Sequence, residues 1–351
     1  MNSCFSVDLR KEDLQKIGRI EMNLKRKIVL LVVSITVGLL ASVSWAGAQE
    51  FPLPKVPNKP QSEWVVGVAM IEFKHPFWGG EIQACKDAAK KYGWKLDIRD
   101  CQGDDATQIA VIERFITKGV DLIILPAVHK ASLVSAVRLA NQAGIPVLTL
   151  NRGILRGEGA KPVAYVGADD FKGGVIQGHM VVEITGGKGN IITLETRLGS
   201  GPQIDRHGGL ESVIQNYDIT IGALYPTHGD REKTLAAVQD ALVKFPKGQL
   251  DAIVCHDSEM PMMALQAVKA AGRTELIGKI IAFDYPQYTK DAILKGELYG
   301  SVLQDPYLQA MICNDAAWLW LSGHGDRIPD PWHTPLVAVT KDNAAQYPAS
   351  W

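Results

Sequence analysis

Six polar or charged side chains stand at or shortly after the ends of short apolar runs in this chain of 351 residues. They are His75, Asn151, Arg152, Asp257, Asp284 and Gln304. Ligands of parallel α/β sheets bind beyond the carboxyl ends of the strands, so we expect these side chains to meet around one ligand. Guanidinium groups donate hydrogen bonds in a fixed fork, and carboxylates accept them. The set therefore predicts a site for a ligand with several hydrogen-bonding groups.

Two neighbouring aromatic residues extend this predicted site. Phe77 and Trp78 stand at the start of a predicted helix, and Gly79 and Gly80 follow them. Flat rings can cover the weakly polar face of a ligand, and glycine lets a ligand approach the backbone closely. Aromatic residues at a helix start are also common core residues, and this alternative stays open.

A second arginine stands in the segment DRHGG at 205–209, which opens a predicted helix. Arg206 can bind a ligand, or it can be solvated or paired with its own helix. Asp257 and Asp284 each end a predicted strand and can accept two hydrogen bonds, or they can cap the helix that follows. If Arg206 is a ligand contact, we expect Arg206→Ala to weaken binding by ~1.5–3 kcal/mol and to leave the fold intact.

The chain lacks the sequence motifs of several common catalytic sites. It has no G-x-S-x-G elbow, no G-x-x-x-x-G-K-[ST] loop and no H-E-x-x-H pair. The segment GGKGN at 186–190 has glycine where a phosphate loop needs Ser or Thr, so it predicts a turn between a helix and a strand. His, Asp and Arg in a cleft could serve as acid, base and clamp, but the sequence favours a protein without catalytic activity.

The cysteines indicate neither a metal site nor a disulfide scaffold. Cys4 lies in the predicted upstream extension. The other four, Cys85, Cys101, Cys255 and Cys313, lack the C-x-x-C spacing of a zinc or redox site, so we expect no metal and no cofactor. A single bridge between Cys85 and Cys101 and a set of buried free thiols both remain open.

The beginning of the chain has the order of a secretory signal. Basic residues at 25–27 precede an apolar run at 28–43, and small residues at 46–48 offer an A-x-A cleavage site. An uncleaved membrane anchor is the alternative, although the run is short for a span of ~20 residues. Residues before Met22 look like an upstream extension, which leaves Met1 or Met22 as the start. The sequence thus predicts export to the periplasm.

Removal of residues 1–48, the predicted upstream extension and signal peptide, leaves 303 residues, enough for two domains. That segment holds seven basic and four acidic residues, so the net charge falls from −1 to −4. Such a surface makes nucleic acid an improbable partner. Residues 49–61 are rich in proline and predict an extended leader.

Short apolar runs alternate with helical patterns after Trp64. Helices are predicted at 78–92 and 105–118. Strands that are apolar on both faces and separated by helices predict parallel sheets covered on both sides, the α/β class. The predicted strands lie at 64–71, 95–100, 121–126, 146–151, 190–195, 251–256, 279–284 and 300–305.

An ordered set of motifs between Trp64 and Val339 resembles the periplasmic sugar-binding proteins of ABC importers, in their ribose-binding type. The motifs are HPFW (75–78), TLNR (149–152), DRHGG (205–209), DSEM (257–260), AFD (282–284) and LQDP (303–306). The resemblance implies two similar lobes, each a parallel sheet flanked by helices, with the ligand cleft between them. The lobes would be 62–168 plus 305–333 and 169–304 plus 334–345.

The resemblance also assigns roles to the predicted site residues. Phe77 and Trp78 match the stacking pair, Arg152 and Arg206 match two arginines that fork onto hydroxyls, and Gln304 matches an amide at a crossover between lobes. The remaining ligand-binding positions are matched by His75, Asn151, Asp257 and Asp284.

Several positions depart from the ribose-binding pattern. His75, Asn151 and Asp257 differ in type from the ribose residues, and Gly229 replaces an aromatic. More room in the cleft favours a larger sugar or a flexible polyol, with Tyr285 or His228 as substitute walls. The charges of Arg152 and Arg206 cancel those of Asp257 and Asp284, which favours a neutral ligand unless Glu72 and Asp169 also point inward.

The sequence thus predicts a solute-binding component of an ABC importer, which captures a neutral sugar or polyol by hinge closure and delivers it to a membrane permease. We expect a monomer without a cofactor. The alternative is a periplasmic sensor that presents a bound small molecule to a chemoreceptor or histidine kinase.

Overall fold

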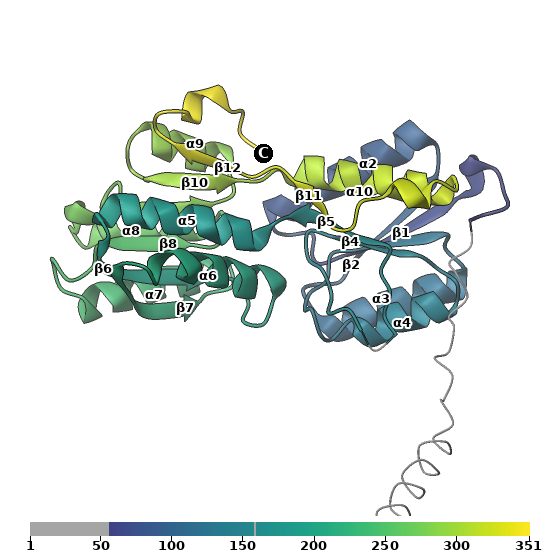
Figure 1. Ribbon diagram of the computed structural model, residues 1–351, viewed down its shortest axis with the longest axis horizontal. Helices are drawn as coiled ribbons and strands as arrows, with labels where there is room; N and C mark the ends of the chain where they lie inside the picture. The colour runs from purple at the N-terminus through teal and green to yellow at the C-terminus, as the bar shows by residue number, and fades with distance from the viewer. Residues whose placement is uncertain (1–55, 158) are drawn as a thin grey trace, which may run out of the picture. The chain divides into compact units, whose positions relative to one another are not determined.

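The computed structural model describes residues 56–157 and 159–351 (Figure 1). The predicted signal peptide, both candidate start codons and the first part of the proline-rich leader lie outside these residues. The described chain forms a 3₁₀ turn, Gln61–Glu63, and then enters β1 (Val65–Met70). The first strand therefore forms at the first predicted apolar run.

Six parallel strands form one sheet, in the order β11-β5-β4-β3-β1-β2. Every residue of the central strands β3 and β4 is buried, as expected for strands with helices on both faces. We call this sheet and its helices the first lobe. The further strands are β2 (Lys95–Asp100), β3 (Leu122–Leu125), β4 (Val147–Leu150), β5 (Ala164–Ala168) and β11 (Trp332–Thr334).

A second six-stranded sheet has the order β12-β10-β9-β8-β6-β7. Its strands are parallel except the edge strand β12, which is antiparallel to β10. We call this sheet and its helices the second lobe. The strands are β6 (Lys188–Glu195), β7 (Asp218–Pro226), β8 (Ala252–Cys255), β9 (Ile280–Phe283), β10 (Gly300–Leu303) and β12 (Val337–Thr340).

Helices cover both faces of the first sheet (Figure 1). Helices α2 (Pro76–Tyr92) and α10 (Pro306–Leu321) pack on one face, where Ala84, Ala88 and Cys313 meet the side chains of β1, β3 and β4. Helices α3 (Asp105–Lys118) and α4 (Val134–Gln142) pack on the other face. The core of this lobe is thus divided between the two faces.

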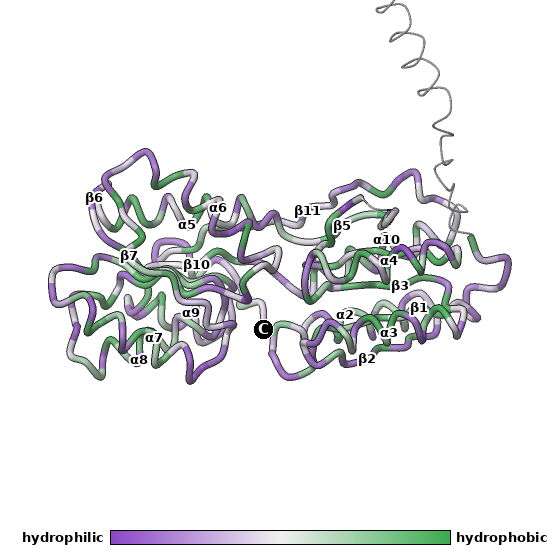
Figure 2. Tube along the Cα trace, turned by 90° about the horizontal axis from the view of Figure 1, so that it is seen from below, coloured by the Kyte–Doolittle hydropathy of each residue, from purple (hydrophilic) through white to green (hydrophobic). Residues whose placement is uncertain are grey.

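The second sheet is covered in the same way. Helices α5 (Asp170–Thr185) and α6 (Gly201–Ile214) lie on one face. Helices α7 (Arg231–Lys244), α8 (Met260–Ala270) and α9 (Gln287–Leu294) lie on the other. Figure 2 shows hydrophobic stretches along the inner elements and hydrophilic segments in the outer loops. Three 3₁₀ turns complete the fold: η2 (Thr274–Leu276), η3 (Gly325–Arg327) and η4 (Ala344–Gln346).

The chain passes between the lobes three times: between β5 and α5, between β10 and α10, and between β11 and β12. Each passage takes only a few residues, such as Gln304 and Asp305 between β10 and α10. Short crossings of this kind can act as hinges. The lobe boundaries inferred from the resemblance remain a proposal.

Each predicted strand and both predicted helices are present, but four strands were missed. Strand β5 contains Gly167, and β7 alternates between exposed and covered residues because it lies at the sheet edge. Strands β11 and β12 have three and four residues and lie at the opposite sheet edges. Strands β7 and β11 lack the continuous apolar run that identifies a central strand, whereas β5 and β12 lie in apolar runs that were overlooked.

Cys85, Cys101, Cys255 and Cys313 are buried free thiols, so the bridge between Cys85 and Cys101 that the sequence left open does not form. Within residues 56–157 and 159–351, no helix is long and apolar enough to cross a membrane. The same residues contain no cluster of three or more His, Cys, Asp or Glu side chains that could hold a metal ion.

Candidate functional site

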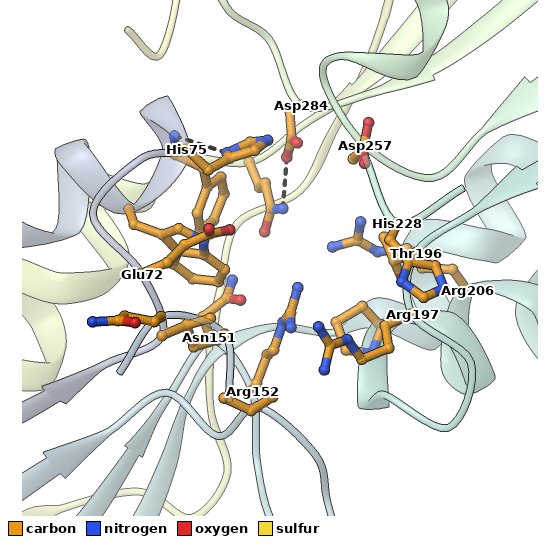
Figure 3. Close-up of a pocket in the computed structure, with 18 residues that line it drawn as sticks. Glu72, His75, Asn151, Arg152, Thr196, Arg197, Arg206, His228, Asp257 and Asp284 are labelled. Carbon is orange, nitrogen blue, oxygen red and sulfur yellow. Dashed lines mark hydrogen bonds between the residues drawn. The ribbon is translucent and has the colours of Figure 1, made fainter. Parts of the chain in front are cut away.

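A cavity of about 170 Å³ lies at the carboxyl ends of strands from both lobes, and all the predicted site residues line it (Figure 3). The first lobe contributes His75, Phe77, Trp78, Asn151 and Arg152. The second lobe contributes Arg206, Asp257 and Asp284, and Gln304 lies in the crossing between β10 and α10. That these residues bind a ligand remains a prediction.

His75 fixes the aromatic wall by capping α2. Its Nδ1 accepts a hydrogen bond from the Phe77 amide at 3.2 Å, which leaves Nε2 to carry the proton in the neutral ring. The rings of Phe77 and Trp78 meet edge to face, with centroids 4.9 Å apart and planes at 80°. Both rings also belong to the core of the first lobe. Phe77 and Trp78 are therefore core residues and cavity residues at the same time.

The surroundings of this wall differ from the prediction at the two glycines and include the last residue of the chain. Gly79 and Gly80 do not line the cavity, and a Cβ on Gly80 would lie 3.1 Å from Pro306, so this glycine serves the packing of α2 on α10. Trp351 packs behind Phe77 with ring centroids 5.6 Å apart. The last residues of the chain therefore pack on the fold and support the aromatic wall.

Arg152 follows β4 at a bend in the backbone. Asn151 before it has φ of 56°, a left-handed conformation that Asn adopts more readily than most residues. The Arg152 guanidinium carbon lies 5.1 Å from the centre of the Trp78 ring, and Nε is buried without a hydrogen-bond partner in the described chain. Burial, together with repulsion from Arg206, lowers the pKa of Arg152 to about 10, so the group stays charged at neutral pH.

Arg206 is held by several groups of the second lobe. Its Nε donates to Asp170 Oδ1 at 2.8 Å, one terminal nitrogen donates to the His256 carbonyl, and the guanidinium carbon lies 3.5 Å from the centre of the Phe283 ring. A Cβ on Gly209 would lie 2.0 Å from the Phe171 carbonyl oxygen, so this glycine of DRHGG allows α6 to approach α5. The arginine is thus both paired and exposed to the cavity.

Asp257 lines the cavity and also caps a helix. Its Oδ1 accepts hydrogen bonds from the amides of Glu259 and Met260, each at 3.0 Å, and so caps the start of α8. A Cβ on Gly229, which has φ of 74°, would lie 2.7 Å from Asp257 Oδ2. Gly229 therefore leaves room for the carboxylate. Burial raises the pKa of Asp257, and His75 opposes this shift.

Asp284 lies in the second lobe at the end of β9, with φ of 71°. Its Oδ1 accepts a hydrogen bond from Gln304 Nε2 at 2.7 Å. Burial raises the pKa of this carboxyl group from 3.8 to about 6, against the opposing effects of Arg206 and Gln304. Its charge therefore changes within a mildly acidic range of pH.

Several cavity residues were not predicted. Thr196 and Arg197 follow β6, and Gln102 and Gly103 follow β2, which places all four at the carboxyl ends of strands. The Arg197 guanidinium reaches across to the first lobe, where a terminal nitrogen would lie 3.8 Å from a Cβ on Gly103. The rule that polar residues after predicted strands are candidate ligand contacts, which identified His75, could have identified these positions as well.

The charges and walls of the cavity differ in part from the prediction. Glu72 and His228 line it, whereas Asp169 does not and instead caps α5 through the Lys172 amide at 3.0 Å. Tyr285 as a substitute wall is wrong, because its ring is fully buried and its hydroxyl donates to the Ala344 carbonyl at 2.9 Å. With every acid ionised and His neutral, the formal charges still sum to zero among Glu72, Arg152, Arg197, Arg206, Asp257 and Asp284.

One ion pair joins the two lobes beside the cavity. Lys130, between β3 and α4, lies 2.6 Å from Asp205 on α6, measured from Nζ to Oδ2. A Cβ on Gly201 would lie 2.5 Å from Lys130 Cε, so the absence of a side chain there lets the lysine lie against α6. The conformation described is therefore one in which the lobes contact each other.

Comparisons with known proteins agree with this geometry. The family described as periplasmic binding protein domain matches residues 66–325. Ribose import binding protein RbsB of Haemophilus influenzae is 28% identical over 283 residues, which cover 81% of this chain and 89% of that protein. A xylitol-binding protein of Mycolicibacterium smegmatis is 30% identical over 256 residues, which cover 73% of this chain and 71% of that protein.

Solved structures show the same fold. An ABC transporter solute-binding protein from Bacillus halodurans with bound myo-inositol matches with a TM-score of 0.75 and 26% identity. The match covers 83% of this chain and 99% of that one. The chain thus has the two-lobed α/β fold of type I periplasmic binding proteins.

Proposed function

The chain belongs to the periplasmic binding protein family, and from that premise we propose that it is the solute-binding component of an ABC importer for a neutral sugar or polyol. The observation that carries this proposal is the cavity between the lobes, in which acidic and basic charges balance beside an aromatic wall. Relatives that bind ribose, xylitol or myo-inositol by name support the ligand class.

The proposed mechanism follows from the types of side chain. A sugar presents weakly polar C–H faces and a rim of hydroxyls, so Phe77 and Trp78 would cover a face. Arg152 and Arg206 would donate to hydroxyl oxygens, and Asp284 would accept from hydroxyl protons. Because these groups come from different lobes, a bound ligand makes more contacts in the closed state and shifts the population towards it.

The finer parts of the proposal concern the protein's setting. We expect a cleaved signal peptide, location in the periplasm, delivery of the ligand to an inner-membrane permease, and a monomeric, non-catalytic protein without a cofactor. The sensor alternative has less support, because the ribose and D-apiose relatives are import binding proteins by name.

Ligand binding by the exported protein tests the proposal. The full chain would be expressed with its own leader and recovered from the periplasm of a Gram-negative host, and its first residue determined. Calorimetry would then compare pentoses, hexoses, linear polyols and inositols with sugar acids and amino acids. Saturable binding of one neutral compound, unchanged after incubation, is the expected result. Binding of acids alone, or turnover of the bound compound, would refute the proposal.

A further inference from the structure

A chain of side-chain amides joins two cavity residues that belong to different lobes. Asn151 Nδ2 donates to Gln309 Oε1 at 2.8 Å, and Gln309 Nε2 donates to Gln304 Oε1 at 2.7 Å. Gln304 Nε2 in turn donates to Asp284 Oδ1 at 2.7 Å, the bond drawn as a dashed line at Asp284 in Figure 3. The chain thus runs from the end of β4 to the end of β9 through the crossing between β10 and α10.

Gln309 is the one member of this chain that does not line the cavity. It lies in the first turn of α10, fully buried, and its amide N–H donates to the Asp305 carbonyl at 3.0 Å. Asp305 caps that helix through the Leu308 amide. The helix therefore holds Gln309 in place, and both polar groups of its side chain are engaged with neighbours.

The direction of each hydrogen bond in this chain depends on the next one. An ionised carboxylate only accepts, so Gln304 must turn its nitrogen to Asp284 and its oxygen to Gln309. Gln309 must then turn its nitrogen to Gln304 and its oxygen to Asn151. The result leaves Asn151 Oδ1 and Asp284 Oδ2 as acceptors and the second Gln304 Nε2 proton as a donor. Without Gln309, the Asn151 amide could exchange oxygen and nitrogen with no change of shape.

We propose that Gln309 is a positioning residue for ligand selection: it transmits the orientation that Asp284 imposes on Gln304 to the amide of Asn151, and so determines which arrangement of ligand hydroxyls the cavity accepts. This inference rests on the proposed function. Gln309 acts through its two neighbours and need not contact the ligand. Loss of the Gln309 amide should therefore change the ratio of the affinities for closely related ligands more than it changes the affinity for any one ligand.

The test compares the tightest-binding neutral ligand with its epimers and deoxy analogues. Gln309→Met keeps the length of the side chain and removes both hydrogen-bonding groups. We expect the affinity ratio between the preferred ligand and its best-bound epimer to fall about tenfold. This is the effect expected when one hydrogen bond between protein and ligand loses its matching donor or acceptor. Gln309→Glu keeps the acceptor for Asn151 and removes the donor for Gln304, so it should restore part of the discrimination. If Gln309→Met does not fold, the affinity ratio of Gln309→Glu can be compared with that of the unmodified protein instead.

Asn314→Leu is the matched control on the same helix. Asn314 is also fully buried, its Nδ2 donates to the Ala310 carbonyl at 2.8 Å and to Cys85 Sγ at 3.4 Å, and it does not line the cavity. This variant should lower the melting temperature and leave the affinity ratio unchanged. Equal ratios in Gln309→Met and Asn314→Leu would show that Gln309 has only a structural role and would overturn the inference.

A second measurement needs no ligand. In the unliganded protein, the Asn151 Nδ2 proton that is donated to Gln309 should exchange slowly with solvent, and Gln309→Met should shift its NMR signal and speed its exchange. Fast exchange in the unmodified protein would overturn the inference even if a ligand binds. Absence of binding to any neutral compound would instead refute the proposed function, and the exchange measurement would still decide whether the amide chain exists.

Discussion

Arg152 and Arg206 reach the same cavity from different lobes, but their surroundings differ. Arg206 is paired with Asp170, bonded to the His256 carbonyl and packed on Phe283. Arg152 lies over Trp78, and its buried Nε has no partner among the described residues. The second lobe thus presents an arginine whose position is fixed before binding. The first lobe presents one whose hydrogen bonds a ligand can complete.

The two arginines should differ in what they contribute to the stability of the fold and to the affinity for a ligand. A buried arginine that satisfies a buried carboxylate supports the fold as well as the site, because removal of one partner leaves the other charge unpaired. Arg152 has an unused donor and supports the fold only through a longer-range attraction, since burial raises the pKa of the Glu81 carboxyl group and Arg152 opposes this shift. The two arginines should therefore respond differently to the same kind of substitution.

Arg206→Ala should have the largest effect. Without its partner, Asp170 becomes an unpaired buried carboxyl group, so we expect the free energy of unfolding to fall by ~3–5 kcal/mol and binding to be lost. This revises the expectation from the sequence that the fold would stay intact. Urea denaturation and calorimetry would measure the two effects. Asp170→Leu combined with Arg206→Leu should recover stability without binding, and an unchanged stability of Arg206→Ala would remove the distinction between the arginines.

Arg152→Leu should weaken binding by ~1.5–3 kcal/mol, about tenfold to a hundredfold, through the loss of charge-assisted hydrogen bonds. Because Arg152 Nε has no partner in the described chain, the free energy of unfolding should stay within ~1 kcal/mol of its original value. Titration calorimetry and urea denaturation of the same preparation would check both values. A loss of stability like that of Arg206→Ala would contradict the comparison.

The acidic half of the site predicts a pH dependence. The pKa of Asp284 is about 6 in the unliganded protein, and a ligand hydroxyl needs the ionised form as acceptor. Affinity should therefore fall as the pH falls through 6, by about tenfold between pH 7 and pH 5, where roughly a tenth of the group is ionised. The effect of this group on stability has the opposite sign, because a raised carboxyl pKa favours the folded state at low pH.

Binding isotherms at several pH values would measure this dependence, with Asp284→Asn as the control. That variant should bind more weakly at pH 7 and lose the change between pH 5 and pH 7. A pH dependence that persists in Asp284→Asn would assign it to another group, such as Asp257.

Lys130→Gln should have the smallest effect. The ion pair with Asp205 is partly exposed, with side-chain exposures of 23% and 38%, so we expect it to stabilise the closed state by only ~0.2–1 kcal/mol. Affinity should fall less than about fivefold, and the difference should vanish in high salt. Calorimetry at low and high salt would check this. A loss larger than that of Arg152→Leu would mean that the lobe contact matters more than the hydrogen bonds of Arg152 to the ligand.

The sequence predicted most of the site because a strand followed by a polar residue is a local pattern. His75, Asn151 and Asp284 could be found in this way, and Arg206 through the DRHGG motif of the family that the chain resembles. Gln309 could not, because a polar residue inside an apolar helix has no local signature and one of its partners, Asn151, is distant in the sequence. Tyr285 was misassigned for a related reason: a ring after a strand can turn either to the cavity or to the core.

The buried thiols have a practical consequence. Cys85, Cys101, Cys255 and Cys313 are each fully buried, and burial raises the pKa of Cys85 and of Cys101 to about 12. Thiolates are the species that react with maleimides, so these cysteines should stay unlabelled at neutral pH. A cysteine introduced at the exposed residue Ile204, one position from Asp205, would then be the reactive thiol of the described chain. A dye attached there would make the protein an optical sensor of its own ligand.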